Sequence, residues 1–327
     1  MKSHQTIISL IVVASLISGC AATGAPGRMR LRDRMAMRAA ETPFIPGVVE
    51  RSLTLDGVRR SYLILDDARP GTKAPVVILL HGGGGNGGTM ISRWQAKAHA
   101  EGLILVAPNG MGQKAKAGTW NAGGCCGEAM TSGSDDVHFI GALIDQMSRS
   151  ADVDANRIFV AGLSNGGMLA HRVAIAMPER LAGVAIVAGA MFGGEPAPRA
   201  PVPILIMHGM KDQVVGFNGG MSPTRFVARA QSKPFKPVSY AANFWRKADG
   251  CTALPNIVTQ GDVTTEVSGN CRAGSEVRVY RLASANHGWP GATDGMAPAL
   301  ERNRYDAISA TDVIWDFFKA HPRDPRP

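Results

Sequence analysis

The sequence predicts an α/β protein with a mostly parallel central sheet that is covered by helices on both faces. A continuous apolar run at 76–80 is typical of a parallel strand buried on both sides. Further along the chain, short apolar runs alternate with segments whose apolar residues recur at helical spacing. This alternation indicates a parallel sheet, with functional residues at the carboxyl ends of its strands.

The expected elements follow in a regular order. A hairpin at 48–65 turns at Asp56-Gly57, a dipeptide that favours tight turns between antiparallel strands. The 327 residues and 45% hydrophobic content suffice for one large core, and neither a repeat nor a second domain is evident. Later strands are expected at 76–80, 103–107, 158–161, 184–188, 204–207 and 276–282, and helices at 90–100, 135–148, 166–177, 239–247 and 306–320.

The first twenty residues have the composition of an export signal. An apolar stretch at 7–17 follows Lys2 and is too short to span a bilayer. It leads into Ile-Ser-Gly-Cys, which resembles the lipobox of bacterial lipoproteins, so we expect acylation of Cys20 and anchoring to the outer membrane. An ordinary signal peptide and release as a secreted protein is the alternative. The predicted organisation is a signal at 1–20, an Arg-rich tether at 21–46, which includes a short helix at 29–40, and a hydrolase domain at 47–327.

Export permits disulfide bonds among the cysteines that remain after Cys20. Four cysteines allow three connectivities. We favour Cys251–Cys271, which closes a loop of roughly twenty residues and stabilises by about 3 kcal/mol in the chain-entropy account. Cys125 and Cys126 are adjacent and either pair with each other or stay reduced. No His or Cys stands at ligand spacing around them, so we expect neither a metal nor a cofactor.

The chain carries a net charge of +9, and part of the excess lies in one stretch. Residues 211–247 hold seven basic residues and one acidic residue, a balance of +6. This stretch is either ordinary solvated surface or a basic rim that attracts an anionic substrate. No motif indicates binding to nucleic acid.

The strongest functional signal is Gly-Leu-Ser-Asn-Gly at 162–166, a G-x-S-x-G pattern. It follows the expected strand at 158–161 and opens the expected helix at 166–177, as in a nucleophile elbow. A serine hydroxyl is a weak nucleophile at neutral pH, so Ser164 requires a base and an acid that orients the base. The pattern therefore predicts the α/β-hydrolase fold with Ser164 as the nucleophile.

In this fold the acid and the base follow the nucleophile in that order. His287 lies in the loop between the last expected strand and the last expected helix, where the base belongs. Asp212 follows the strand at 204–207 and is the only carboxylate between Glu195 and Asp249. We predict a Ser164–His287–Asp212 triad, and we expect His208 to brace the acid loop rather than react.

An oxyanion hole must stabilise the charge that develops on the carbonyl oxygen. One donor should be the backbone N–H of Asn165, the residue after the nucleophile. The other should come from the glycine-rich loop at 82–85, where we choose Gly83.

Six motifs together resemble the secreted polyhydroxybutyrate depolymerase and feruloyl esterase family of α/β-hydrolases. The resemblance covers about residues 48–320 and implies the same triad and the Cys251–Cys271 disulfide. It also implies that Trp120, Asn121 and Trp289 lie near the substrate. The motifs are HGGGGN at 81–86, TWNAGGCCG at 119–127, DDVHFI at 135–140, GLSNGG at 162–167, HGMKDQVVGFNGG at 208–220 and HGWPG at 287–291.

These observations favour a serine hydrolase that cleaves a carboxylic ester through an acyl-enzyme. The resemblance implies a hydroxyalkanoate oligomer or a feruloyl-type ester as substrate. Two alternatives remain open: a depolymerase of an anionic polyamide such as poly(aspartic acid), and a non-catalytic surface binding protein on a hydrolase scaffold. The sequence leaves the oligomeric state undetermined.

Overall fold

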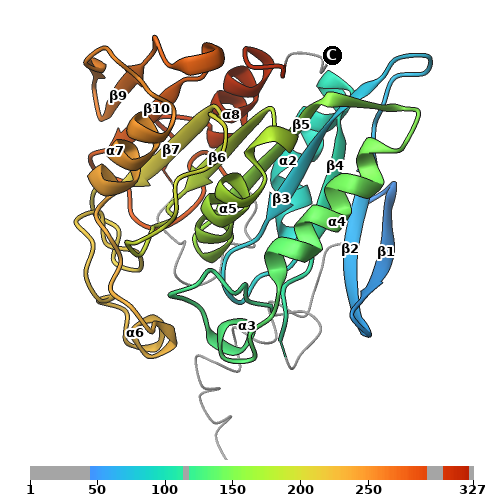
Figure 1. Cartoon of the computed structure of the whole chain (residues 1–327), viewed down its shortest axis with the longest axis horizontal. Coiled ribbons are helices and arrows are strands. Elements are labelled where there is room, and N and C mark those ends of the chain that lie inside the picture. The colour runs from blue at the N-terminus through green and yellow to red at the C-terminus, as the bar shows by residue number, and fades with distance from the viewer. Residues whose placement is uncertain (1–44, 113–117, 293–304, 324–327) are drawn as a thin grey trace, which may run out of the picture.

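A computed structural model of the chain describes residues 45–112, 118–292 and 305–323. One ten-stranded sheet runs through this part of the molecule in the order β1-β2-β4-β3-β5-β6-β7-β10-β9-β8 (Figure 1). Its strands are β1 Val48–Leu55, β2 Val58–Asp66, β3 Ala74–Leu80, β4 Ile104–Pro108, β5 Val153–Leu163, β6 Gly183–Val187, β7 Ile204–Gly209, β8 Asn256–Gln260, β9 Val263–Ser268 and β10 Val277–Leu282.

The six central strands, from β4 to β10 in spatial order, are mutually parallel. Antiparallel hairpins extend the sheet at both ends, β1–β2 on one side and β8–β9 on the other. The predicted fold class is therefore confirmed, with a mixed rather than a purely parallel sheet.

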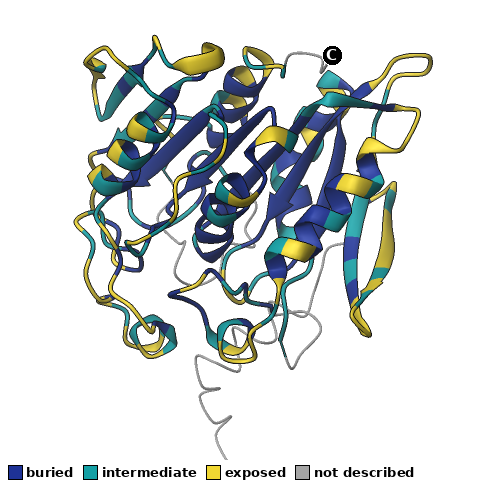
Figure 2. Cartoon of the chain, in the orientation of Figure 1, coloured by how far each residue is buried: buried dark blue, intermediate teal, exposed yellow. Residues whose placement is uncertain are grey.

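Helices cover both faces of the sheet because alternate side chains of each central strand point to opposite sides. The central strands are buried, whereas the outer hairpins carry exposed residues (Figure 2). Val76 and Ile78 belong to one apolar core, while Val77 and Leu79 belong to the other. The first core is closed by α4 Asp136–Ser148, α5 Asn165–Ala176 and α7 Val238–Ala248, and the second by α2 Gly87–Glu101 and α8 Ala310–Lys319.

Four elements were not predicted from the sequence. The helices α3 Gly127–Thr131 and α6 Arg225–Ala230 are too short to show a helical period. The hairpin of β8 and β9 was missed because all five residues of β8 are exposed, so burial imposes no alternation of polar and apolar residues. These elements lie outside the central strands, where burial constrains the sequence less.

The predicted signal peptide, Cys20 and the predicted tether helix lie outside the described residues. Within residues 45–112, 118–292 and 305–323, no helix has the length and apolar character needed to cross a bilayer.

Candidate active site

The turn between β5 and α5 holds Ser164 in a conformation that L-residues rarely adopt. Its φ and ψ are 55° and −121°. The Ser164 N–H donates to the Val187 carbonyl of the neighbouring strand at 2.8 Å, and the Ser164 carbonyl accepts from the Met168 N–H at 2.9 Å. Such positive φ costs free energy and persists where the surrounding structure fixes it, as at a nucleophile elbow.

The two glycines of the G-x-S-x-G pattern are required by close backbone approach. A Cβ on Gly162 would lie 2.3 Å from the Gly166 carbonyl oxygen, and a Cβ on Gly166 would lie 2.3 Å from the Leu80 carbonyl oxygen. Any side chain at either position would therefore force the backbone apart. The tight turn brings the start of α5 against the end of β3, where the glycine-rich loop begins.

Asp212 and His287 meet in the loops that follow β7 and β10, two adjacent strands. The His287 Nδ1 lies 2.8 Å from the Asp212 Oδ2, and both side chains are buried. The Lys211 N–H donates to the Ala285 carbonyl at 3.0 Å and ties the two loops together. Because a carboxylate can only accept, Nδ1 carries the proton in this contact, which leaves Nε2 as the basic nitrogen.

The Asp212 carboxylate is held ionised. Burial alone would raise its pKa, but the charge on His287 and the hydrogen bonds from His208 and His287 hold it well below the usual range for aspartate. The N–H groups of Val214 and Val215 also donate to Oδ1, at 2.7 and 2.8 Å.

His208 braces the acid loop. Its Nε2 lies 2.8 Å from the Val215 carbonyl oxygen and 3.3 Å from the Asp212 Oδ2. Both neighbours accept, so Nε2 carries the proton, and among the described residues the buried Nδ1 has no hydrogen-bond partner. The bracing role expected from the sequence agrees with this geometry.

The glycine-rich loop after β3 packs against the nucleophile elbow. A Cβ on Gly82 would stand 3.5 Å from the Ser164 Cβ, and a Cβ on Gly83 would stand 3.7 Å from the Asn165 Cβ. The loop therefore lies beside the two residues that would present the nucleophile and one oxyanion donor.

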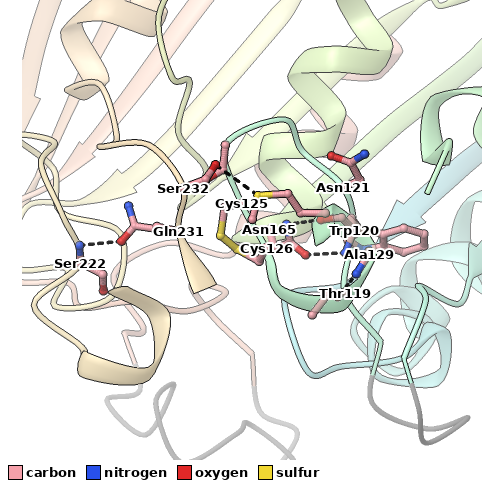
Figure 3. The surroundings of a disulfide bond; sticks show 12 residues. Thr119, Trp120, Asn121, Cys125, Cys126, Ala129, Asn165, Ser222, Gln231 and Ser232 are labelled. Atoms are coloured by element: carbon pink, nitrogen blue, oxygen red, sulfur yellow. Dashed lines mark hydrogen bonds between the residues drawn. A yellow bond between two sulfur atoms is a disulfide. The ribbon is translucent and has the colours of Figure 1, made fainter. Parts of the chain in front are cut away.

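Trp120 connects the glycine-rich loop with Asn165 (Figure 3). Its indole N–H donates to the His81 carbonyl at 2.8 Å. The Trp120 N–H donates to the Asn165 Oδ1 at 2.7 Å, and the Asn165 Nδ2 donates to the Trp120 carbonyl at 3.0 Å. One buried residue thus contacts both His81, at the start of the glycine-rich loop, and Asn165.

His81 supports the same loop as a neutral imidazole. The Gly110 N–H donates to Nε2 at 2.9 Å, so Nδ1 carries the proton and donates to the Gly82 carbonyl at 2.8 Å. Burial lowers the pKa of His81 to about 4. Its ring lies 4.7 Å from that of Trp120, centroid to centroid.

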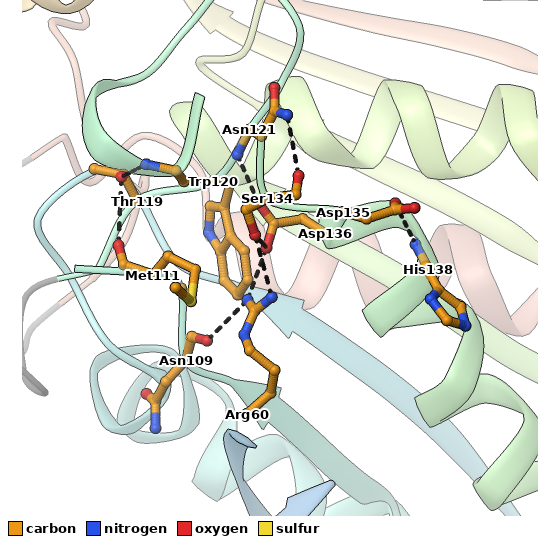
Figure 4. A network of polar contacts seen from close by, with 12 residues as sticks. Arg60, Asn109, Met111, Thr119, Trp120, Asn121, Ser134, Asp135, Asp136 and His138 are labelled. Atoms are coloured by element: carbon orange, nitrogen blue, oxygen red, sulfur yellow. Dashed lines mark hydrogen bonds and ion pairs between the residues drawn. The ribbon is translucent and has the colours of Figure 1, made fainter. Parts of the chain in front are cut away.

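A buried ion pair holds the segment that carries Trp120 (Figure 4). The Arg60 Nη2 on β2 lies 2.7 Å from the Asp136 Oδ1 at the start of α4. The Asp136 Oδ2 accepts from the Asn121 N–H at 2.7 Å. Sequence reasoning did not assign this pair. The doubled acid of DDVHFI was the available signal, because Asp135 caps α4 while Asp136 turns inward.

An apolar cluster lies beside the nucleophile helix. Cys125 and Cys126 are paired with each other and pack in it with Met168, one turn after Ser164. Val214 and Val215 enter from the loop that carries Asp212. This buried cluster therefore joins the nucleophile helix to the loop that carries Asp212.

The three residues expected near the substrate use their polar atoms within the protein. Trp120 is fully buried, and the Asn121 side chain donates to the Ser134 carbonyl at 3.0 Å and accepts from the Gly123 N–H at 3.1 Å. The Trp289 indole donates to the Thr311 Oγ1 at 3.0 Å and lines a pocket of about 320 Å³ between α2 and α8. Contact with substrate stays a prediction for all three.

Comparison with known proteins decides the family. A profile described as phospholipase/carboxylesterase matches residues 67–234, half of the chain. The chain belongs to the phospholipase/carboxylesterase family. It is therefore an esterase-type hydrolase, and the predicted resemblance to feruloyl esterases is confirmed by the relatives.

Relatives of this phospholipase/carboxylesterase chain include two feruloyl esterases. The chain is 28% identical to feruloyl esterase C of Emericella nidulans over 84% of its length and 91% of that protein. It is 32% identical to feruloyl esterase B of Piromyces equi over 60% of its length, but spans only 37% of that relative. The solved acetyl xylan esterase of Aspergillus awamori superposes with a TM-score of 0.56 at 13% identity, over 83% of this chain and 99% of that one, and shows the common fold.

Five of the seven basic residues at 211–247 divide into two sets. Arg246 pairs with Glu266 at 2.6 Å, and Lys236 lies over the Tyr240 ring. Arg225, Arg229 and Lys233 are exposed and form no ion pair with any residue that the structure describes. The described ranges also contain no group of three potential metal ligands.

Proposed function

We propose that this chain is a serine esterase that cleaves carboxylic esters through an acyl-enzyme on Ser164. The observation that carries the proposal is the buried Asp212–His287 contact of 2.8 Å, in loops at the same edge of the sheet as the Ser164 elbow. In a catalytic triad, a buried aspartate orients the histidine that activates the serine hydroxyl.

In the proposed reaction, the Ser164 Oγ attacks the ester carbonyl while the His287 Nε2 takes its proton. Asp212 holds the imidazole in the required tautomer and stabilises the imidazolium. His287 then returns the proton to the departing alcohol. Water repeats the sequence on the acyl-enzyme and releases the acid. Each step moves a proton or an acyl group between protein, substrate and water.

The N–H groups of Asn165 and Gly83 would donate to the oxyanion. Trp120 supports this role because its contacts with His81 and Asn165 fix both donor loops. We therefore assign Trp120 as a positioning residue. Donors that are already oriented stabilise the transition state without a reorganisation cost.

A feruloyl-type ester is the favoured substrate, because feruloyl esterases are among the relatives. Hydroxyalkanoate oligomers remain the second ester class. The poly(aspartic acid) and non-catalytic alternatives receive no support from the relatives, which are esterases.

Export outside the cytoplasm remains part of the proposal. Both cysteine pairs in the structure support it, because disulfides persist in oxidising compartments. Acylation of Cys20 would be tested by mass spectrometry of the mature N-terminus.

The function is tested by two measurements on the mature protein. A fluorophosphonate should label Ser164, and Ser164→Ala should abolish the labelling. Methyl ferulate, hydroxybutyrate oligomers and p-nitrophenyl esters are then compared by kcat/KM. Labelling at another residue, or ester turnover that survives Ser164→Ala, would contradict the proposal. Faster cleavage of hydroxybutyrate oligomers would replace the feruloyl assignment and keep the mechanism.

A further inference from the structure

The two edges of the central sheet are protected very differently. The outer strand β1 carries Glu50 and Arg51, charges of the kind that discourage pairing with another sheet. The opposite outer strand, β8, reads Asn-Ile-Val-Thr-Gln and has neither a charge nor a proline. Ile257 and Val258 are 54% and 46% exposed, and Leu254 just before the strand is 93% exposed. Among the described strands β8 pairs only with β9, so its outer edge has no strand partner.

The β8 edge is also rigid. The Cys251–Cys271 disulfide, predicted from the sequence and present in the structure, joins the segments that enter and leave the hairpin. On β9, the Glu266 carboxylate pairs with Arg246 of α7 and with Arg281 of β10. A strand that is already fixed in an extended conformation loses little conformational entropy when it binds a partner.

The register of the hairpin shows which backbone groups of β8 are open. Gln260 and Val263 face each other across the two-residue turn Gly261-Asp262, so they form the closing hydrogen-bonded pair. Hydrogen-bonded and non-hydrogen-bonded pairs alternate along an antiparallel ladder. The N–H and C=O groups of Ile257 and Thr259 therefore point away from β9. The close approach of the Thr259 and Thr264 hydroxyls, 2.9 Å, agrees with a non-hydrogen-bonded pair.

We propose that β8 pairs in antiparallel fashion with β8 of a second copy of this chain, about a two-fold axis at Val258. Ile257 of each copy then lies opposite the partner's Thr259, and these residues exchange their four outward hydrogen bonds. Pro255, which cannot donate, falls opposite the partner's Gly261 and ends the ladder. The two sheets become one continuous sheet.

A second copy fits this edge better than a foreign strand does. The strand is uncharged although the whole chain carries +9, so two copies can pair here without like-charged side chains facing each other on the two strands. A two-fold axis also pairs the β-branched residues Ile257, Val258 and Thr259 with one another, a favourable cross-strand combination. The triad loops lie elsewhere, at the carboxyl ends of the parallel strands.

The two-fold axis gives a sharp cross-linking test. Across the new ladder, Val258 of one copy lies opposite Val258 of the second copy in a non-hydrogen-bonded pair. The two Cα atoms are then about 4.5 Å apart, a distance that a disulfide spans. Val258→Cys should therefore form a dimer that resists SDS and dissociates with reductant. The matched control is Val49→Cys, an equally exposed valine (42%) on β1. No cross-linking of Val258→Cys, or equal cross-linking of both, would overturn the proposal.

Sedimentation velocity of the mature protein gives an independent test. The wild type should associate reversibly, and Ile257→Lys should weaken association by about tenfold or more, because a lysine places like charges at the edge. Val49→Lys should change nothing. Ester hydrolysis, retained by both variants, reports correct folding separately. A wild type that stays monomeric at every concentration, or dissociation by Val49→Lys alone, would refute the pairing.

Discussion

The two halves of the candidate site are held by different kinds of contact. On the oxyanion side, Trp120, His81 and Asn165 are joined by hydrogen bonds between neutral groups. On the acid side, an ionised Asp212 is held between two histidines. The oxyanion residues are therefore joined by neutral contacts, on a segment that the Arg60–Asp136 ion pair holds, whereas the acid side depends directly on the charge of Asp212.

The largest effect should come from neutralising the acid. Asp212→Asn keeps the size of the side chain but presents an amide that favours the wrong tautomer of His287. We expect kcat/KM to fall by about 10⁴-fold, as in other triads. Asp152→Asn, at an exposed carboxylate, is the control. A loss below about tenfold would show that the acid side does not act through charge.

The next effect should come from the oxyanion side. Trp120→Phe removes the indole N–H that donates to the His81 carbonyl but keeps a buried aromatic ring. We expect kcat to fall by roughly tenfold or more, with KM little changed, because misplaced donors weaken only transition-state binding. Trp245→Phe is the matched control, since that indole is also buried and bonds to His171. Equal losses in both variants would indicate general destabilisation.

The contact from His208 should have a smaller, pH-dependent effect. His208→Asn removes a donor to the Asp212 Oδ2, which makes the carboxylate more basic and stabilises the His287 imidazolium. The acid limb of kcat/KM against pH should therefore move to higher pH, with a loss of about tenfold at the optimum. A lower kcat/KM with an unmoved limb would assign His208 a purely structural role.

Acid should destabilise the protein through two buried neutral histidines, His81 and His171, before it affects Asp212. Burial lowers the pKa values of His81 and His171 to about 4, against 6.5 in the unfolded chain. Between these values the unfolded chain binds more protons, so the free energy of unfolding should fall as pH falls from 6.5 to 4, by about 3 kcal/mol per histidine. The pKa of Asp212 is lowered, so its contribution persists throughout this window.

Urea unfolding at several pH values measures this slope. His171→Asn, whose Oδ1 can still accept from the Trp245 indole, should flatten the slope. A slope that is the same in both proteins would contradict the assignment of a buried neutral His171.

The smallest effect is expected at the basic surface outside both halves. Arg225→Glu with Arg229→Glu should change kcat/KM for a neutral ester by less than about twofold, because exposed charges are screened. Arg51→Glu with Arg149→Glu, exposed elsewhere, is the control. A selective, salt-dependent loss with an anionic ester would instead make residues 211–247 a substrate-attracting rim.

The sequence by itself determined the six central parallel strands and the order of the candidate residues. Buried parallel strands such as 76–80 must be continuously apolar, and the elbow at Ser164 admits only glycine at 162 and 166. Both features can therefore be recognised from a short stretch of sequence. Local chemistry also placed Asp212 and His287 after the correct strands.

Only the tertiary structure decided which side chains support these residues. The Arg60–Asp136 pair joins positions 76 residues apart, and Trp120 reaches Asn165 across 45 residues. No local pattern encodes such contacts, because each arises when loops that follow different strands meet at one edge of the sheet. The hairpin of β8 and β9 was also missed, because an exposed edge strand is not constrained by burial. That exposure is what leaves the edge open to a second copy.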